Sequence, residues 1–201
     1  MKPSLIFWYE FASTYSWLAA ERIETLAAQA GVEVLWRPFL LGPIFAAQGW
    51  TSSPFNLFPA KGRNMWRDMD RQCARMSLPP IVRPEPFPQN SLLAARVATA
   101  LPPAARPPFS RAVYRVEFTQ GRSITDRAVL AAVLKDAGAP PDALAAAEAA
   151  ETKSALRQAT EAAQSLGIFG APSFTTRSGE LFWGNDRLDQ AIEWAREELV
   201  R

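Results

Sequence analysis

Residues 1–40 constrain the fold most, because a strand, a helix and a second strand follow one another there. Residues 4–9 are apolar, aromatic and β-prone, which predicts a buried strand. Apolar side chains at helical spacing predict a helix over residues 14–30, which Gly31 is suited to end. A second strand is expected from Val32 to Trp36. Such a β-α-β unit has parallel strands and a right-handed crossover.

The middle of the chain is predicted to be helical, with joints rich in proline. Residues 42–60 contain several glycines and prolines and are expected to form a loop over a surface or a site. Apolar side chains at helical spacing predict an amphipathic helix from Lys61 to Met76. A break is expected near Glu151 and Thr152 in the last of the later helical patterns. Those patterns cover residues 90–101, 108–119, 125–137 and 141–166.

Strand character returns after Gly167. Residues 173–176 and 180–183 flank Ser178-Gly179, which predicts a β-hairpin. A final amphipathic helix is expected over residues 186–200. The apolar residues expected on one face of it are Leu188, Ile192, Ala195 and Leu199.

These elements predict an α/β fold. Residues 1–40 and 167–201 are expected to form one domain, and residues 41–166 a large all-helical domain inserted into it. Without the insertion, the order of the predicted elements is β-α-β-β-β-α. That order is the one expected of a thioredoxin-like core.

The thiol and imidazole content excludes several kinds of chemistry. Cys73 is the single cysteine, and the chain has no histidine. The chain therefore cannot form an intramolecular disulfide or carry out dithiol exchange by itself. Without histidine, Ser-His-Asp and Cys-His catalysis are excluded, together with most zinc sites, so no metal site is expected.

The charge and hydropathy of the chain bear on its partners. A formal net charge of +2 gives no reason to expect a nucleic acid, and is compatible with an anionic small molecule. The N-terminus lacks the apolar length and small-residue cleavage pattern of a signal peptide, and no stretch reaches transmembrane length. We therefore expect a cytoplasmic protein with no membrane partner.

Ser13-Thr14-Tyr15-Ser16 lies directly between the first strand and its helix. A helix N-terminus presents free N–H groups and the positive end of the helix dipole, so it favours an anion such as a thiolate. Ser13 is equally suited to cap the helix, with Ser16 in its first turn. Spacing alone favours capping over catalysis.

Gly170–Phe174 leads into the strand after the helical segment. Pro172 is tolerated at the first position of a strand, because no ladder donor is needed there. A functional interpretation requires a cis bond between Ala171 and Pro172, which would turn the backbone of Ala171 towards a ligand. Most X–Pro bonds are trans, so composition alone does not favour this interpretation.

Trp183–Arg187 lies before the final helix. Asn185 or Asp186 is suited to cap that helix, and this is the favoured structural interpretation. Alternatively, the helix N-terminus holds a carboxylate while Asp186 meets an ammonium group. A γ-glutamyl group carries both on one carbon.

Taken in order, these segments resemble the family that contains the 2-hydroxychromene-2-carboxylate isomerases and the kappa-class glutathione transferases. This family belongs to the DsbA-like branch of thioredoxin folds. The resemblance covers nearly the whole chain, and the pairing of a Ser-x-x-Ser segment with both C-terminal segments is rare outside the family. The segments that carry it are Phe11–Ala19, Pro59–Gly62 with Asp68 and Arg71, Phe87–Asn90, Ile168–Pro172 and Trp183–Arg187.

The resemblance implies that glutathione is the cofactor and that Ser13 is the catalytic serine. Ala171-Pro172 matches the cis-proline element that pairs with the glutathione backbone. The other implied cofactor-binding residues are Lys61 at the glycyl carboxylate, Asn185 and Asp186 at the γ-glutamyl group, and Ser52. Ser52 stands where kappa enzymes often have asparagine, and Thr14 replaces the usual proline.

The implied activity is the glutathione-dependent isomerisation of 2-hydroxychromene-2-carboxylate to trans-o-hydroxybenzylidenepyruvate. One alternative is a kappa-like transferase that joins glutathione to electrophiles, and another is a non-catalytic DsbA-like binding module. The expected partner is a small aromatic carboxylate substrate. Relatives are often dimeric, so the resemblance makes a homodimer possible, but the sequence itself does not indicate an oligomeric state.

An aromatic cluster in the middle segment is expected either to wall the substrate pocket or to pack between helices. Its members are Phe45, Trp50, Phe55, Phe58 and Trp66. Arg63 or Arg67 could receive the substrate carboxylate, although a surface position is expected for each. Cys73 is expected to be an inert packing residue on the apolar stripe of its helix.

Overall fold

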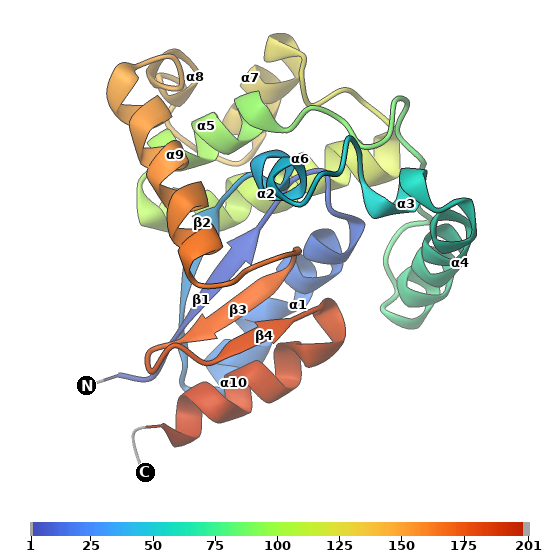
Figure 1. Ribbon diagram of the computed structural model, residues 1–201. Coiled ribbons are helices and arrows are strands. Elements are labelled where there is room, and N and C mark those ends of the chain that lie inside the picture. Colours follow the sequence, from blue (N-terminus) through green and yellow to red (C-terminus); the bar gives the residue numbers. More distant parts are fainter. Residues whose placement is uncertain (1, 199–201) are drawn as a thin grey trace.

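The computed structural model describes residues 2–198 and contains a four-stranded mixed sheet covered by helices (Figure 1). The strands are β1 (Ser4–Tyr9), β2 (Glu33–Pro38), β3 (Ser173–Thr176) and β4 (Leu181–Trp183). They lie in the order β2-β1-β3-β4, with β2 parallel to β1, β3 antiparallel to β1 and β4 antiparallel to β3. The predicted β-α-β unit and the predicted hairpin are both confirmed.

The central strand β1 sends its side chains alternately into two apolar cores. Leu5, Phe7 and Tyr9 enter the larger core, which includes residues of α1 (Thr14–Ala30), α6 (Arg106–Gln120) and α10 (Leu188–Glu197). Ile6 and Trp8 face a smaller core on the other side of the sheet. Because both faces are buried, β1 is a continuous apolar run rather than an alternating one.

Aromatic rings join the strands of the larger core. Phe7 stacks on Phe174 of β3 with ring centroids 5.5 Å apart, and it meets the Trp36 ring of β2 edge-on at 4.9 Å. Each such pair adds about 0.5–1.5 kcal/mol to the effect of burial alone. On the other face, Trp8 Nε1 donates to Thr175 Oγ1 at 2.8 Å. These contacts fix the register of β1 against β3.

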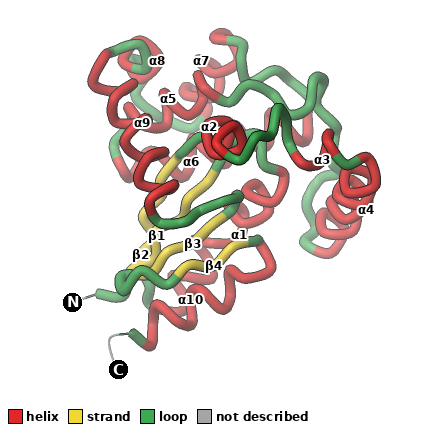
Figure 2. The backbone as a smooth tube through the Cα atoms, in the orientation of Figure 1, coloured by secondary structure: helices red, strands yellow, loops and turns green. Residues whose placement is uncertain are grey.

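The chain between β2 and β3 forms helices joined by loops (Figure 2). Besides α6, these are α2 (Leu41–Ala47), α3 (Pro54–Leu57), α4 (Pro59–Arg75), α5 (Leu92–Ala100), the 3-10 helix η1 (Pro103–Ala105), α7 (Arg127–Asp136), α8 (Ala143–Ala146) and α9 (Ala150–Ser165). The larger core runs from the sheet into these helices without interruption, through residues such as Met69 and Phe109. The division into domains at residues 40 and 167 stays a prediction.

The predicted loop over residues 42–60 is wrong, because α2 and α3 occupy much of this stretch. Ile44 of α2 is buried in the smaller core, which gives α2 an apolar contact to form on. Pro54 is the first residue of α3, and Ser53 Oγ caps it by accepting the N–H of Phe55 at 3.3 Å. Proline is favoured at the first position of a helix, where its missing N–H is not needed, so proline in this stretch does not by itself indicate a loop.

Other element boundaries differ from the prediction by a few residues. The second strand is Glu33–Pro38, and the alanine-rich helix is interrupted over residues 147–149 rather than at 151–152. The last helix is preceded by the 3-10 helix η2 (Asn185–Arg187), while Leu199 lies outside the described residues. Within residues 2–198, no helix is both long enough and apolar enough to cross a membrane.

Candidate active site

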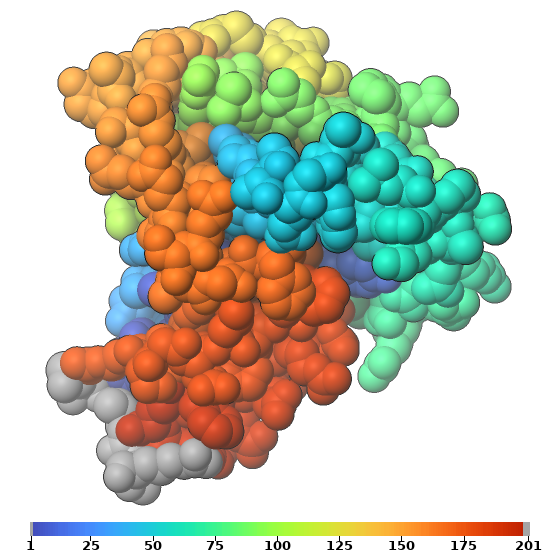
Figure 3. Space-filling model, viewed as in Figure 1, coloured from blue at the N-terminus to red at the C-terminus, as the bar shows by residue number. Residues whose placement is uncertain are grey.

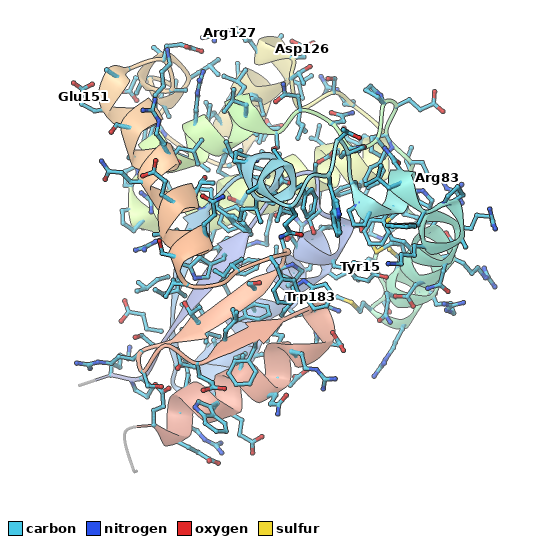
Figure 4. All side chains as sticks on the ribbon, in the orientation of Figure 1. Tyr15, Arg83, Asp126, Arg127, Glu151 and Trp183 are labelled. Atoms are coloured by element: carbon cyan, nitrogen blue, oxygen red, sulfur yellow. The ribbon has the colours of Figure 1, made fainter. Side chains whose placement is uncertain are left out.

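Three segments that stand out in the sequence meet at one edge of the sheet. Because β1 and β3 are antiparallel and pair Trp8 with Ser173, the residues that follow β1 lie beside those that precede β3. The Gly184 N–H donates to the Pro172 carbonyl at 2.9 Å and brings the end of β4 to the same place. In Figure 4, Trp183 from β4 and Tyr15 from α1 accordingly lie on the same side of the molecule.

Ser13 both caps α1 and contacts the proline loop. Its Oγ accepts the N–H of Ser16 at 3.1 Å, so the capping interpretation is confirmed. The same Oγ donates to the carbonyl of Ala171 at 3.0 Å. The Ser13 side chain is half-buried, so the helix cap is also within reach of a ligand.

The Ala171–Pro172 peptide bond is cis, as the functional interpretation required. Ser173 Oγ donates to the Gly170 carbonyl at 2.8 Å and holds the loop against the start of β3. The Trp183 indole lies over Gly170 so closely that a Cβ there would come within 2.3 Å of Nε1. A side chain at position 170 would therefore displace the indole of Trp183.

A cavity of about 650 Å³ opens at this edge, within the size range of small-molecule sites. Its wall comes from the turn after β1, from α2, α3 and the start of α4, from residues 87–92, and from residues 169–171 with Trp183. Figure 3 shows the dark-blue N-terminal part of the chain between the orange-red C-terminal part and the cyan segment of α2 and α3. The cavity thus lies between the sheet and the helices that follow β2.

Four of the residues predicted for the site line this cavity: Ser13, Ser52, Lys61 and Ala171. Ser52 Oγ accepts from Asn56 Nδ2 at 3.2 Å. The Lys61 ammonium lies 4.6 Å from the centroid of the Phe58 ring and, among the described residues, forms no ion pair with a carboxylate. Lys61 and Glu10 are the only charged side chains among the described residues that line the cavity.

Three predicted residues, Pro172, Asn185 and Asp186, do not line the cavity. Asn185 is buried, and its Oδ1 accepts from Arg22 of α1 at 3.2 Å, so its side-chain oxygen is already bound. Asp186 is exposed in η2. The pKa of the Tyr15 hydroxyl is raised mainly by burial, then by Asp68, and to a smaller extent by the charge of Asp186. The Asp186 side chain lies beside Gly184, which directly follows Trp183 of the cavity wall, so Asp186 lies near the outer edge of the cavity.

The aromatic cluster divides between the two roles considered for it. Phe45, Trp50 and Phe55 line the cavity, whereas Trp66 packs on Phe87 at 4.8 Å instead. Phe58 is exposed beneath Lys61 and does not line the cavity either.

The two arginines considered for a substrate carboxylate lie away from the cavity. Arg63 and Arg67 of α4 are both exposed, and Arg67 pairs with Asp70 at 3.7 Å. The surface position expected for each is confirmed. Lys61 is therefore the cation that α4 supplies to the cavity.

Cys73 is buried in the larger core, and burial raises the pKa of its thiol to about 11. A thiol is a nucleophile only as its thiolate, so Cys73 is inert at neutral pH, as predicted.

Sequence reasoning missed the polar part of the cavity wall that Glu10, Gln89 and Ser91 form. Ser91 Oγ donates to Glu10 Oε1, and Gln89 Oε1 accepts the N–H of Ile124 at 2.8 Å. Burial raises the pKa of the Glu10 carboxyl to about 7, a rise that the hydrogen bond from Ser91 limits. The sequence signal for this part of the wall is Glu10, a charged residue directly after the apolar strand.

Comparison with known proteins agrees with this geometry. The family model of the DSBA-like thioredoxin domain matches residues 4–193. A curated 2-hydroxychromene-2-carboxylate isomerase from Sphingobium xenophagum is 28% identical over 191 residues, which cover 94% of this chain and 96% of the relative.

Two solved structures share the fold. A structure of 2-hydroxychromene-2-carboxylate isomerase matches with a TM-score of 0.85 at 22% identity, over 98% of this chain and 96% of that chain. A "probable DsbA oxidoreductase" from Streptomyces coelicolor matches with a TM-score of 0.74 at 20% identity, over 97% and 90%. The predicted DsbA-like thioredoxin fold is therefore confirmed.

Proposed function

The chain belongs to the DsbA-like thioredoxin domain family, and on that premise we propose that it is a glutathione-dependent isomerase acting on 2-hydroxychromene-2-carboxylate or a closely related aromatic acid. The name of the curated relative, which aligns over 94% of this chain, supports the reaction class. The position of Ser13 supports the dependence on glutathione. Its hydroxyl lies at the N-terminus of α1, in the wall of the cavity and in contact with Ala171.

The residues around the cavity are suited to glutathione. The chain has no thiol at this helix terminus, and Cys73 is buried elsewhere, so a reactive sulfur has to be brought by a ligand. Lys61 has no carboxylate partner among the described residues and is available for a carboxylate of the tripeptide. Ser52 and Ala171 would complete the contacts within the cavity, and Asp186 would meet the γ-glutamyl group at its edge. Asn185 is buried and bound to Arg22, so it is not one of these contacts.

Bound glutathione would supply a thiolate that adds reversibly to the substrate and permits rotation about a carbon–carbon bond. An ordinary thiol has a pKa near 8.5, and lowering it by about two units requires about 2.7 kcal/mol. A charge-assisted hydrogen bond contributes about 1.5–3 kcal/mol and a helix N-terminus about 0.3–1 kcal/mol. Ser13 and the first turn of α1 together would contribute about 1.8–4 kcal/mol, a range that includes the required value.

The Ser13 hydroxyl acts as a donor and does not ionise. Its proton is held by the Ala171 carbonyl at 3.0 Å and, because a hydroxyl rotates freely, it can turn to a sulfur atom when one binds. The apolar part of the cavity, with Phe45, Trp50 and Phe55, would receive the aromatic ring and exclude water from it.

The direct test uses the purified protein, the chromene acid and glutathione. We expect isomerisation that saturates with glutathione, and a calorimetric titration in which glutathione binds one site per chain. Parallel assays with a chlorodinitrobenzene-type electrophile separate an isomerase from a transferase, since only the transferase forms a stable conjugate. If glutathione produces no heat and no activity, the proposal is wrong and a non-catalytic binding module takes its place.

A further inference from the structure

The cavity contains a second chemically active group that the thiolate mechanism does not use. Glu10 follows β1 directly, is 6% exposed and forms part of the cavity wall. The Ser13 N–H donates to the Glu10 carbonyl at 3.1 Å, so a single turn places both residues in the wall of one cavity. Burying a carboxyl group lowers the stability of the folded protein, so a buried carboxyl in the wall of a ligand cavity suggests a function there.

The surroundings of Glu10 keep its proton affinity high. Tyr114 and Glu117 of α6 are the titratable groups that face it, and both are fully buried. Neither carboxyl oxygen of Glu117 has a hydrogen-bond partner, and no lysine or arginine within residues 2–198 pairs with either glutamate. Burial raises the pKa of Glu117 far above its usual range and that of Glu10 to about 7.

The Ser91 hydroxyl fixes the orientation of Glu10. Ser91 is 7% exposed, also lines the cavity, and donates to Glu10 Oε1. The backbone N–H of Ala12 also donates to the Glu10 carboxyl. A carboxylate has about four acceptor sites, so these two hydrogen bonds leave others for a ligand. A group that titrates near neutral pH is also the most effective in general acid–base catalysis.

We propose that Glu10 is the general acid–base that opens the ring of the substrate, with Ser91 as the residue that positions it. This proposal rests on the proposed function, because it takes a cyclic hemiketal acid as the substrate. Glu10 removes the proton from the hemiketal hydroxyl, whose O–H electron pair becomes the new C=O bond. The bond from that carbon to the ring oxygen breaks, and its electron pair goes to the ring oxygen. Glu10 then returns the proton to that oxygen, which gives a phenol.

The ring-opening step involves no sulfur, so it can be tested without glutathione. Exchange between the closed and opened forms of the acid is followed by NMR with the apoprotein, across pH 5 to 9. We expect catalysis that increases as pH rises through about 7, because the ionised form of Glu10 is the base. Glu10→Gln should lower the catalysed rate about 100-fold and remove this pH dependence, whereas Glu33→Gln, at the opposite end of the sheet, should change neither.

Two further measurements separate the possible failures. Glutathione should bind Glu10→Gln with unchanged affinity, since Glu10 is not among its expected contacts. If Glu10→Gln does not fold, Ser91→Ala provides the test: loss of the hydrogen bond that lowers the pKa of Glu10 should move the pH dependence upward. Retention of the wild-type rate and pH dependence by either variant, or no ring opening by the wild type, overturns the role of Glu10 and leaves glutathione binding intact. Failure of glutathione to bind the wild type contradicts the proposed function instead.

Discussion

Ser13 Oγ donates to the carbonyl oxygen of Ala171 at 3.0 Å, across 158 residues of sequence. The same oxygen accepts the N–H of Ser16 and caps α1. The residue that caps α1 therefore also lines the cavity, where the proposed function gives its hydroxyl a second use in ligand binding.

Replacing Ser13 should affect both stability and cofactor binding. Ser13→Ala removes the cap of α1 and should lower the free energy of unfolding by about 1 kcal/mol, measured by urea denaturation. It should also decrease isomerisation about 100-fold under saturating glutathione, because the thiol loses its donor.

Asp126→Ala is the matched control for this variant. Asp126 caps α7 by accepting the N–H of Ala128 at 2.7 Å, and it lies far from Trp183 in Figure 4. It should lose a similar amount of stability and keep full activity. Equal losses of activity in the two variants would mean that Ser13 is only a structural residue.

Lys61 should contribute a charge to glutathione binding. Lys61→Gln should weaken binding about three- to tenfold in calorimetry, and added salt should decrease the difference because the contact is near the surface. Arg63→Gln removes the same charge from the same helix, away from the cavity, and should leave the affinity unchanged. If the two substitutions weaken glutathione binding equally, Lys61 acts through the overall electrostatic field of the protein rather than through a direct contact with glutathione.

Glu117 should make the folded state less stable as pH rises. Burial raises the pKa of Glu117 in the folded state, so the folded protein retains a proton that the unfolded chain releases above about pH 4.3. Stability is then lost with increasing pH, by up to about 1.4 kcal/mol per pH unit, until the folded-state pKa is reached.

Glutamine does not titrate, so Glu117→Gln should become progressively more stable than the wild type between about pH 5 and pH 7. Urea unfolding at several pH values measures the difference. Glu180→Gln, an exposed substitution, should show a constant difference. If the difference in unfolding free energy between Glu117→Gln and the wild type is also independent of pH, then water or a conformational change solvates the Glu117 carboxyl.

Gly170 should be intolerant of a side chain. Gly170→Ala would place a Cβ 2.3 Å from Trp183 Nε1, so the indole has to leave the cavity wall. We expect weaker glutathione binding and a lower melting temperature. Gly42→Ala also lies in the cavity wall but meets nothing within 4 Å, and it should be neutral in both measurements.

The resemblance, rather than a local pattern, predicted that the three segments meet, because it implied that Ser13, Ala171-Pro172 and Asn185-Asp186 all contact glutathione. The β-α-β unit and the hairpin could be predicted from local patterns. The antiparallel pairing of β1 with β3, which brings Ser13 to Ala171, could not. The helix α2 was missed because glycine and proline were interpreted as loop signals, whereas Ile44 makes tertiary contacts that stabilise a helix there.

The rest of the site depended on contacts that no local pattern contains. Ser91 is 81 residues from Glu10, so the orientation of that carboxyl is visible only in the folded chain. Asn185 binds Arg22 because η2 packs on α1, which its capping pattern does not predict. Likewise, helical packing alone decides that Phe45 enters the cavity and Trp66 does not.

The central claim is that α1 and Ser13 hold the sulfur of bound glutathione as a thiolate. A pH titration of the ultraviolet absorbance of bound glutathione tests this claim most directly. Cys73 does not interfere, since burial raises its pKa to about 11. We expect bound glutathione to titrate about two units below a free thiol near 8.5, and to return towards that value in Ser13→Ala. A bound thiol that titrates at or above the free value in the wild type would contradict the account.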